Sequence, residues 1–140
     1  MAGATREETF DIPAKQFYNA LLDYEHYPKI LSEVDSIDVL EKDEHQAKIQ
    51  YNIHIVKKIS YTLKMTHDRP RRVAWDLHAG SLFKKNSGEW LIEDLGDKCK
   101  VTYSVDVALK VFAPKAITSK LVSVSLPRMM NAFYEHARNM

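Results

Sequence analysis

The segments AKIQYNIHI (Ala47–Ile55) and ISYTLKMT (Ile59–Thr66) alternate between apolar and polar side chains at every step. An alternation with period two places the apolar side chains on one face of a β-strand. The same pattern continues in Val73–Leu77 and in Cys99–Leu109. Because the opposite face of each segment is polar, the pattern predicts an antiparallel sheet with one face in water.

Polar turn segments separate these strands. Turns are predicted at Lys42–Glu44, Asp68–Arg71 and Gly96–Lys98. Leu82–Lys85 and Gly88–Asp94 form either one strand or two, with a kink near Asn86. Two further strands, Thr5–Asp11 and Ser36–Glu41, complete the set. The sequence therefore predicts a sheet of six to seven strands.

Two short helices are expected after the first strand. Asp11-Ile-Pro13 predicts a helix start, in which Asp11 caps the helix and Pro13 occupies the first turn. Apolar residues then recur at helical spacing from Phe17 to Tyr24. Tyr27-Pro28 predicts a break, because the residue before a proline is pushed out of the helical region. Lys29–Leu31 adds at most one more turn.

The chain closes with one long amphipathic stretch, Pro114–Met140, which predicts a C-terminal helix with a kink or brief break at Pro127. One helix is ~10–12 Å across. Five or six strands at ~4.8 Å spacing are about twice as wide. The sheet must therefore curl around the helix, and the space that the helix does not fill becomes a lined hollow. We expect an α+β fold in which a curved antiparallel sheet grips the long C-terminal helix.

Composition indicates one compact globular domain that spans residues 1–140. The chain is 45% hydrophobic and 28% charged, and its net charge is +1. That balance does not favour DNA or another nucleic acid as the partner of the whole protein. The lone Cys99 forms no intrachain disulfide, and the first residues lack the apolar region of a secretory signal. No run approaches ~20 apolar residues. We therefore expect a soluble, cytoplasmic protein.

The inward strand positions are rich in aromatic side chains. A filled core is the simple interpretation, but a buried phenol needs a hydrogen-bond partner, and a cavity that holds ligand or water supplies partners more readily than aliphatic side chains do. We favour a pocket. The residues expected to line it are Tyr51, Ile53, Tyr61, Leu63, Met65, Trp75, Leu77, Trp90, Ile92, Tyr103, Val105, Met130 and Phe133.

Signs of catalysis or of a bound metal are weak. The six histidines are scattered, with no HxH or HExxH pair. His67 shares parity with the inward Met65, but a solvated turn beside Asp68 is the simpler explanation. The carboxylates of Glu89, Glu93 and Asp106 fall on the outer face by parity. We expect no metal, no cofactor and no catalytic residues, so an enzyme is less favoured than a binding protein.

Basic residues gather at the turns and strand ends. They are Lys57, Lys58, Arg69, Arg71, Arg72, Lys84, Lys85, Lys98 and Lys100. Ordinary solvated turns would explain them. The alternative is that several turns meet at one end of the sheet and form a positive rim for an anionic membrane surface or for a ribosome. Spacing alone does not separate these two interpretations.

Several strings in the second half of the chain resemble a known family. They are Asp68-Arg-Pro-Arg-Arg-Val-Ala-Trp75-Asp-Leu, Gly80, Leu82-Phe83-Lys-Lys, Gly88-Glu-Trp90, Val101-Thr-Tyr103 and Phe133-Tyr-Glu-His-Ala137-Arg138. This order is similar to that of the START-like helix-grip superfamily, in its polyketide cyclase/dehydrase or coenzyme Q-binding START-like branch. The resemblance implies a curved antiparallel sheet that grips a long C-terminal helix around a cavity for apolar ligands.

That branch includes lipid and quinone carriers, aromatic polyketide cyclases and a ribosome-association toxin. Its cyclases place polar and charged side chains deep in the cavity, whereas the inward faces here offer mainly tyrosines. The expected function is therefore non-catalytic binding or carrying of a hydrophobic small molecule, namely a lipid, a quinone or a polycyclic compound. The alternatives are an enzyme of the aromatic polyketide cyclase/dehydrase type and a ribosome-association module.

Overall fold

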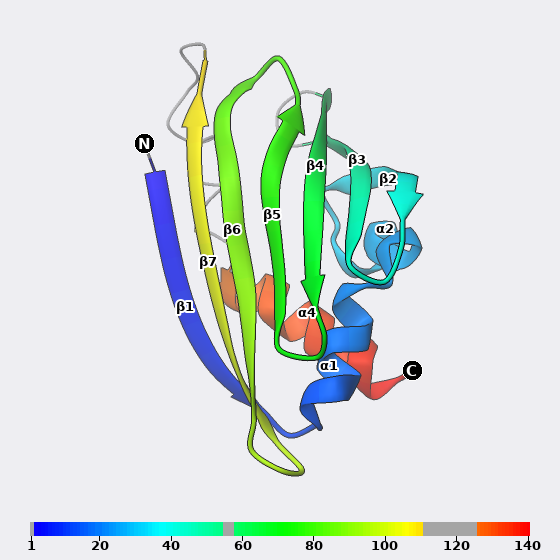
Figure 1. Ribbon diagram of the computed structural model, residues 1–140, viewed down its shortest axis with the longest axis vertical. Helices are drawn as coiled ribbons and strands as arrows, with labels where there is room; N and C mark the ends of the chain where they lie inside the picture. The colour runs from blue at the N-terminus through cyan, green and yellow to red at the C-terminus, as the bar shows by residue number, and fades with distance from the viewer. Residues whose placement is uncertain (1, 55–57, 111–125) are drawn as a thin grey trace.

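A seven-stranded antiparallel sheet forms the body of the protein (Figure 1). The computed structural model describes residues 2–54, 58–110 and 126–140. The strands are β1 (Ala2–Phe10), β2 (Val34–Lys42), β3 (Gln46–His54), β4 (Lys58–Asp68), β5 (Arg72–Ala79), β6 (Phe83–Asp94) and β7 (Cys99–Leu109). Their order in the sheet is β1-β7-β6-β5-β4-β3-β2. The first strand lies at one edge, where it pairs with the last one, and the β1–β2 connection leads to the opposite edge, from which β2 to β7 follow as successive neighbours.

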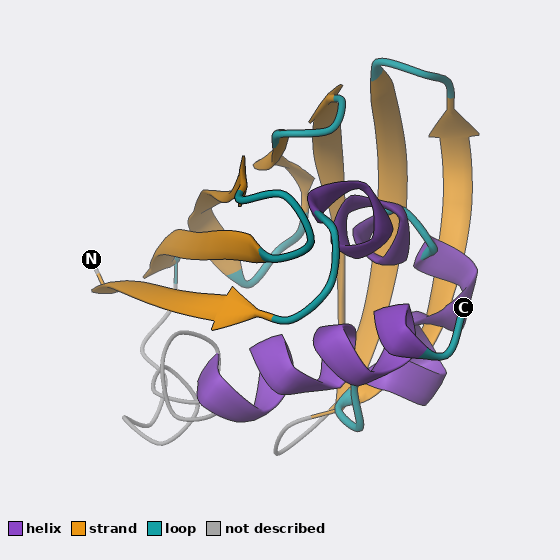
Figure 2. Ribbon diagram, turned by 90° about the horizontal axis from the view of Figure 1, so that it is seen from below, coloured by secondary structure: helices purple, strands orange, loops and turns teal. Residues whose placement is uncertain are grey.

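The helices lie on the concave side of this sheet. They are α1 (Ala14–Leu21), the 3-10 turn η1 (Tyr24–His26), α2 (Tyr27–Ile30) and α4 (Leu126–Arg138). Figure 2 shows the strands curving around α4, with the helices of the β1–β2 connection beside it. The expected α+β architecture, a curved sheet with a C-terminal helix, is confirmed. No helix in the described part of the chain is long and apolar enough to cross a membrane.

Two local predictions need correction. Pro13, not Asp11, occupies the N-cap of α1, and no side chain caps that helix. The predicted break at Tyr27-Pro28 comes earlier, because α1 ends at Leu21. Pro28 lies in the first turn of α2, which begins at Tyr27, and a proline in the first turn sacrifices no helical hydrogen bond. Of the two possibilities that the sequence left open for the segment from Phe83 to Asp94, the structure has one strand.

The sequence predicts a kink in that strand near Asn86. In the structure the irregularity is a register shift between Phe83 and Lys85, closer to the start of the strand. Beyond the shift, Asn86 and Gly88 continue the regular pairing with β7.

Helix α4 turns an apolar stripe toward the sheet. Leu126, Met130, Phe133 and Ala137 are buried at the helical spacing that the sequence predicts. Pro127 lies in the first turn of α4, where a missing N–H is tolerated. The predicted helix over residues 114–125, and any kink where it meets α4, lie outside the described residues.

Aromatic rings join the helices to the sheet. Phe10 stacks on Phe17 with ring centroids 5.3 Å apart, and on Tyr134 of α4 at 4.8 Å. Tyr27 meets Phe133 edge to face at 5.2 Å. Each buried side chain of this size contributes about 1.5–3 kcal/mol of hydrophobic free energy. These contacts hold α1 and α4 against the end of β1, and α2 against α4.

Strands β5 and β6 pair only over the short stretch from Arg72–Leu91 to Trp75–Gly88. Trp75 faces Gly88 at the end of this stretch, and its indole covers the glycine. A Cβ added at Gly88 would lie 2.5 Å from the Trp75 ring and would also collide with the carbonyl oxygen of Ser104. Glycine is therefore required here so that the indole can lie flat across β6.

Replacing Gly88 by alanine should lower the free energy of unfolding by about 1–3 kcal/mol, because the added methyl group overpacks this crossing. Urea denaturation measures the change. Gly96→Asn is the control, since a side chain at Gly96 meets no atom within 4 Å and asparagine tolerates positive φ. The control should lose less stability. A Gly88→Ala protein as stable as the original would contradict this account of Trp75.

His67 is buried, which corrects the prediction of a solvated turn. Its side chain is packed against η1, where the hydroxyl of Tyr24 lies 2.8 Å from the Nε2 atom. The two rings also stack, with centroids 6.0 Å apart. Burial lowers the pKa of His67 below its ordinary value. The imidazole is therefore held neutral in the folded protein, where it links β4 to the turn after α1.

This burial predicts a dependence of stability on pH. Because the folded-state pKa of His67 lies below the unfolded value of about 6.5, its contribution is full above that pH and is lost as the pH falls below it. Urea midpoints between pH 7.5 and pH 5 should therefore fall less steeply for His67→Gln than for the original protein. Comparing the two proteins removes the contributions of the other histidines. Parallel curves would show that His67 does not titrate differently on unfolding.

Candidate functional site

The concave face collects every residue that the sequence places in the predicted pocket. All thirteen belong to one apolar cluster with α1 and α4, and only Tyr61 and Leu77 are partly exposed. They come from β3 (Tyr51, Ile53), β4 (Tyr61, Leu63, Met65), β5 (Trp75, Leu77), β6 (Trp90, Ile92), β7 (Tyr103, Val105) and α4 (Met130, Phe133). The inward placement of the side chains thus follows the period-two parity. Their role as the wall of a ligand cavity stays a prediction.

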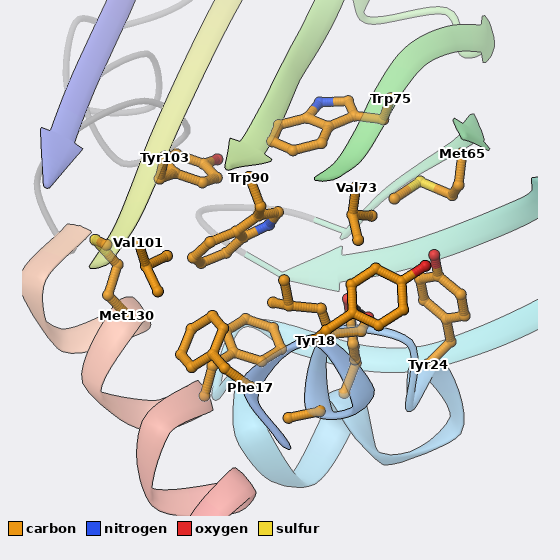
Figure 3. Packing of buried hydrophobic residues seen from close by; sticks show 14 of the residues in the cluster. Phe17, Tyr18, Tyr24, Met65, Val73, Trp75, Trp90, Val101, Tyr103 and Met130 are labelled. Carbon is orange, nitrogen blue, oxygen red and sulfur yellow. Dashed lines mark hydrogen bonds between the residues drawn. The ribbon is translucent and has the colours of Figure 1, made fainter. Parts of the chain in front are cut away.

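The lower part of this face is filled by the helices. Trp90 packs against Phe17 of α1, with ring centroids 5.9 Å apart, and against Phe133 of α4 at 5.4 Å. Figure 3 shows Trp90 between Tyr103 and Phe17, with Met130 beside them. Met130 is fully buried. Trp90, Phe133 and Met130 therefore hold the helices in place.

The upper part of the face carries two groups of stacked rings. In Figure 1, α1 and α4 cross behind the middle and lower parts of the sheet, and no described helix lies behind its upper end. Tyr51 and Tyr61 stack nearly parallel, with centroids 5.3 Å apart, and Tyr61 meets Phe83 edge to face at 4.9 Å. Trp75 stacks on Tyr103 at 5.5 Å. These rings form the upper aromatic face, and we treat it as the candidate site.

Three phenol groups supply most of the polarity of the upper aromatic face. Burial raises the pKa of Tyr51, Tyr61 and Tyr103, so all three are neutral at physiological pH. A neutral phenol both donates and accepts a hydrogen bond. Within residues 2–54, 58–110 and 126–140, none of the three hydroxyl groups has a hydrogen-bond partner. The upper aromatic face therefore offers three hydrogen-bonding groups on apolar walls.

Sequence reasoning missed two members of this face. Asn86 is buried on β6, and its Oδ1 accepts a hydrogen bond from the Trp75 Nε1–H at 3.1 Å. This bond fixes the indole where β5 and β6 stop pairing. Phe83 is fully buried beside Tyr61. The parity of Asn86 with Gly88 and Trp90 was the available signal, although the neighbouring Ser87-Gly88 made a kink the simpler interpretation.

The described interior holds few groups suited to catalysis. Its buried polar side chains are Thr62, His67 and Asn86, and His67 is bonded to Tyr24 near η1. Burial raises the pKa of the Cys99 thiol to about 11, which disfavours a thiolate nucleophile. General acid–base chemistry on the upper aromatic face would therefore fall to phenols whose pKa values lie far above neutrality.

The outer face carries the carboxylates, as parity predicts. Glu89 accepts a hydrogen bond from Arg72 at 2.7 Å, and Asp106 pairs with Lys85 at 2.8 Å. Glu93 is exposed and lies 3.3 Å from Lys100. These charged groups are neutralised on the convex surface and do not reach the upper aromatic face.

The basic turns divide between the two ends of the sheet. Because β4 to β7 are antiparallel, Lys58, Lys84 and Lys85 lie at one end, and Arg69–Arg72 with Lys98 and Lys100 lie at the other. Lys57 is outside the described residues. Arg69 sits 5.3 Å above the ring of Tyr18. The described basic residues therefore do not form the single rim that the sequence left open.

Comparisons with known proteins agree with this architecture. A START superfamily protein from Mycobacterium smegmatis has 17% sequence identity, a TM-score of 0.82, and coverage of 98% of this chain and 97% of that one. The Zhui aromatase/cyclase from Streptomyces sp. R1128 has 15% identity, a TM-score of 0.81, and coverage of 99% and 94%. A STAR-related lipid transfer protein from Xanthomonas axonopodis has 14% identity, a TM-score of 0.80, and coverage of 97% and 85%. These likenesses concern the fold.

Family membership rests on the sequence. In a comparison with curated proteins, no sequence matches this chain. The family model described as polyketide cyclase / dehydrase and lipid transport matches residues 10–134, from the end of β1 into α4. The chain therefore belongs to the polyketide cyclase/dehydrase and lipid transport family.

Proposed function

We propose that this protein binds or carries a hydrophobic small molecule on the upper aromatic face and does not catalyse a reaction on it. The observation that supports this proposal is the combination of stacked rings with three neutral phenols in a buried setting. Aromatic rings offer flat apolar contact, and phenols bind oxygen atoms at the edge of a ligand. A quinone or another ring-bearing lipid with carbonyl or hydroxyl oxygens fits this chemistry.

The family and one of the similar structures support the same class of ligand. The family description includes lipid transport, and one similar structure is described as a STAR-related lipid transfer protein. A cytoplasmic location and a single domain over residues 1–140 remain part of this proposal. Coenzyme Q is one candidate among the quinones.

A reaction of the cyclase/dehydrase type is the second candidate, favoured by the similarity to the Zhui aromatase/cyclase. The upper aromatic face offers it phenols as proton donors, since no carboxylate or lysine in the described part of the chain is buried and the buried His67 is bonded to Tyr24 near η1. A ribosome-association module or a docking site for anionic membranes would need the basic turns. Lys85 and Lys100 are already paired with carboxylates, and the turns lie at opposite ends of the sheet.

A short-chain ubiquinone should quench the tryptophan emission of the protein, because Trp75 lies on the upper aromatic face. Leu77→Trp should weaken the binding of that quinone at least about tenfold, since Leu77 faces the interior at the upper end of β5 and an indole there would take ligand space. Leu91→Trp is the matched control on the exposed outer face of β6 and should bind normally. If neither the quinone nor the apolar dye 1-anilinonaphthalene-8-sulfonate bound, the interior would be a filled core.

The phenols should act on ligand oxygens rather than on hydrocarbon. Tyr61→Phe and Tyr103→Phe should each reduce quinone affinity by about 0.5–1.5 kcal/mol, or two- to tenfold, through the loss of one hydrogen bond. The affinity for an oxygen-free probe such as anthracene should stay unchanged, as should both affinities in Tyr134→Phe, a control on α4. Equal losses for quinone and anthracene would show that the substitutions act on packing alone.

A further inference from the structure

Three potential metal ligands from distant parts of the sequence meet where α1 gives way to η1. Asp23 lies in the link between these two elements, His26 ends η1, and His136 lies in the last turn of α4. The Nδ1 atom of His26 is 2.7 Å from Asp23 Oδ1, and the Nε2 atom of His136 is 2.8 Å from Asp23 Oδ2. One carboxylate thus holds two imidazoles, whose ring centroids are 5.6 Å apart.

The packing of the helices creates this cluster. In Figure 2 the C-terminal end of α4 lies against the helices of the β1–β2 connection. Gln16 of α1 donates a hydrogen bond from its side-chain amide to the carbonyl oxygen of Ala137 at 2.7 Å. Ala137 is fully buried, so its neighbour His136 is held at the edge of the same contact and reaches Asp23. Sequence spacing shows only the Asp23–His26 pair, because His136 is 113 residues from Asp23.

We propose that Asp23, His26 and His136 bind a divalent transition-metal ion, with zinc as the expected cation. One ligand atom from each residue can be chosen so that all three lie within 4.8 Å of one another. Bonds of about 2.0–2.2 Å to nitrogen and oxygen in a tetrahedral zinc site place ligand atoms roughly 3.3–3.5 Å apart. Small side-chain rotations would bring the three atoms to that spacing, and the cation would replace the protons now shared with the carboxylate.

The electrostatics suit a cation. An aspartate carboxylate is ionised at neutral pH, and the Asp23 carboxylate lies within hydrogen-bond distance of both imidazoles. Lys42 lines the same surface groove as Asp23, but its ammonium donates to the carbonyl oxygen of Leu22 at 3.2 Å and lies over the Tyr24 ring. Asp43, Glu44 and Arg69 also line this groove, and the Arg69 guanidinium lies over the Tyr18 ring. With Asp23, the groove therefore carries three carboxylates and two basic side chains.

The donor set selects the class of metal. Two imidazoles with one carboxylate suit zinc, cobalt, nickel or copper, whereas magnesium and calcium prefer oxygen ligands alone. His26 is half-exposed, so a fourth position would be taken by water. Among the described residues, the second nitrogen of each imidazole has no hydrogen-bond partner. Because such partners strengthen metal sites 10- to 100-fold, we expect an affinity in the micromolar range rather than that of a structural zinc site.

Tag-free protein, first treated with a chelator and then dialysed, should bind one zinc ion per chain in isothermal titration calorimetry. Cobalt should give visible absorption bands that zinc abolishes. Asp23→Asn and His26→Gln should each weaken zinc binding at least about tenfold. His26→Gln is the decisive variant, because it leaves intact the contact of Asp23, in the α1–η1 link, with His136 of α4. Circular dichroism and urea midpoints confirm that each variant folds.

His78→Gln is the matched control, since His78 is exposed on β5 away from the cluster, and it should bind zinc normally. Loss of binding in the two cluster variants with retention in the control would support the site. No heat of binding at millimolar zinc, or equal binding by the original protein and a folded His26→Gln variant, would overturn it.

Discussion

The sheet is much wider than the helix that packs on it, and this difference in width determines the architecture. Seven strands at ~4.8 Å spacing give a sheet about 30 Å across, whereas a helix with its side chains is ~10–12 Å wide. The apolar face of the sheet cannot be covered by α4 alone, so the sheet curves and the β1–β2 connection adds α1, η1 and α2 to the same side. The apolar surface that α4 leaves uncovered is occupied by the other helices and by aromatic side chains.

Aromatic side chains divide that surface into two parts with different roles. Around Trp90 the rings of Phe17 and Phe133 close the contact with α1 and α4, which gives the fold its rigid base. Next to this contact, Trp75 stacks on Tyr103, which lies opposite Trp90, and nearer the upper end of the sheet Tyr51 stacks on Tyr61. Among the described residues the hydroxyl groups of these three tyrosines have no hydrogen-bond partner.

Period-two patterning was sufficient to predict the strands and the direction of their side chains, because parity is a local property. The patterning failed to predict the surroundings of a side chain where residues distant in the sequence pack against it. His67 was predicted to lie in a solvated turn, but Tyr24 from a distant segment buries it. Asp23 and His136 are 113 residues apart, so sequence spacing does not predict their contact. Asn86 was missed because its polarity suggested a turn, although a partner in Trp75 makes it an interior residue. The helix start was misplaced because Pro13 and Asp11 offer competing signals.

The short pairing between β5 and β6 leaves fewer backbone hydrogen bonds at this point than between the other neighbouring strands of the sheet. One part of the sheet is β1-β7-β6 and the other is β5-β4-β3-β2. Their backbones pair along the ladder from Arg72 to Trp75, with one further hydrogen bond from the Ile92 N–H to the Arg71 carbonyl oxygen, and α1 contacts both parts. Above Trp75 side chains join the two parts: the Trp75–Asn86 hydrogen bond, the Trp75–Tyr103 stack and the Tyr61–Phe83 contact. Above the ladder, the two parts of the sheet are therefore held together by individual side-chain contacts instead of by a continuous backbone hydrogen-bond ladder.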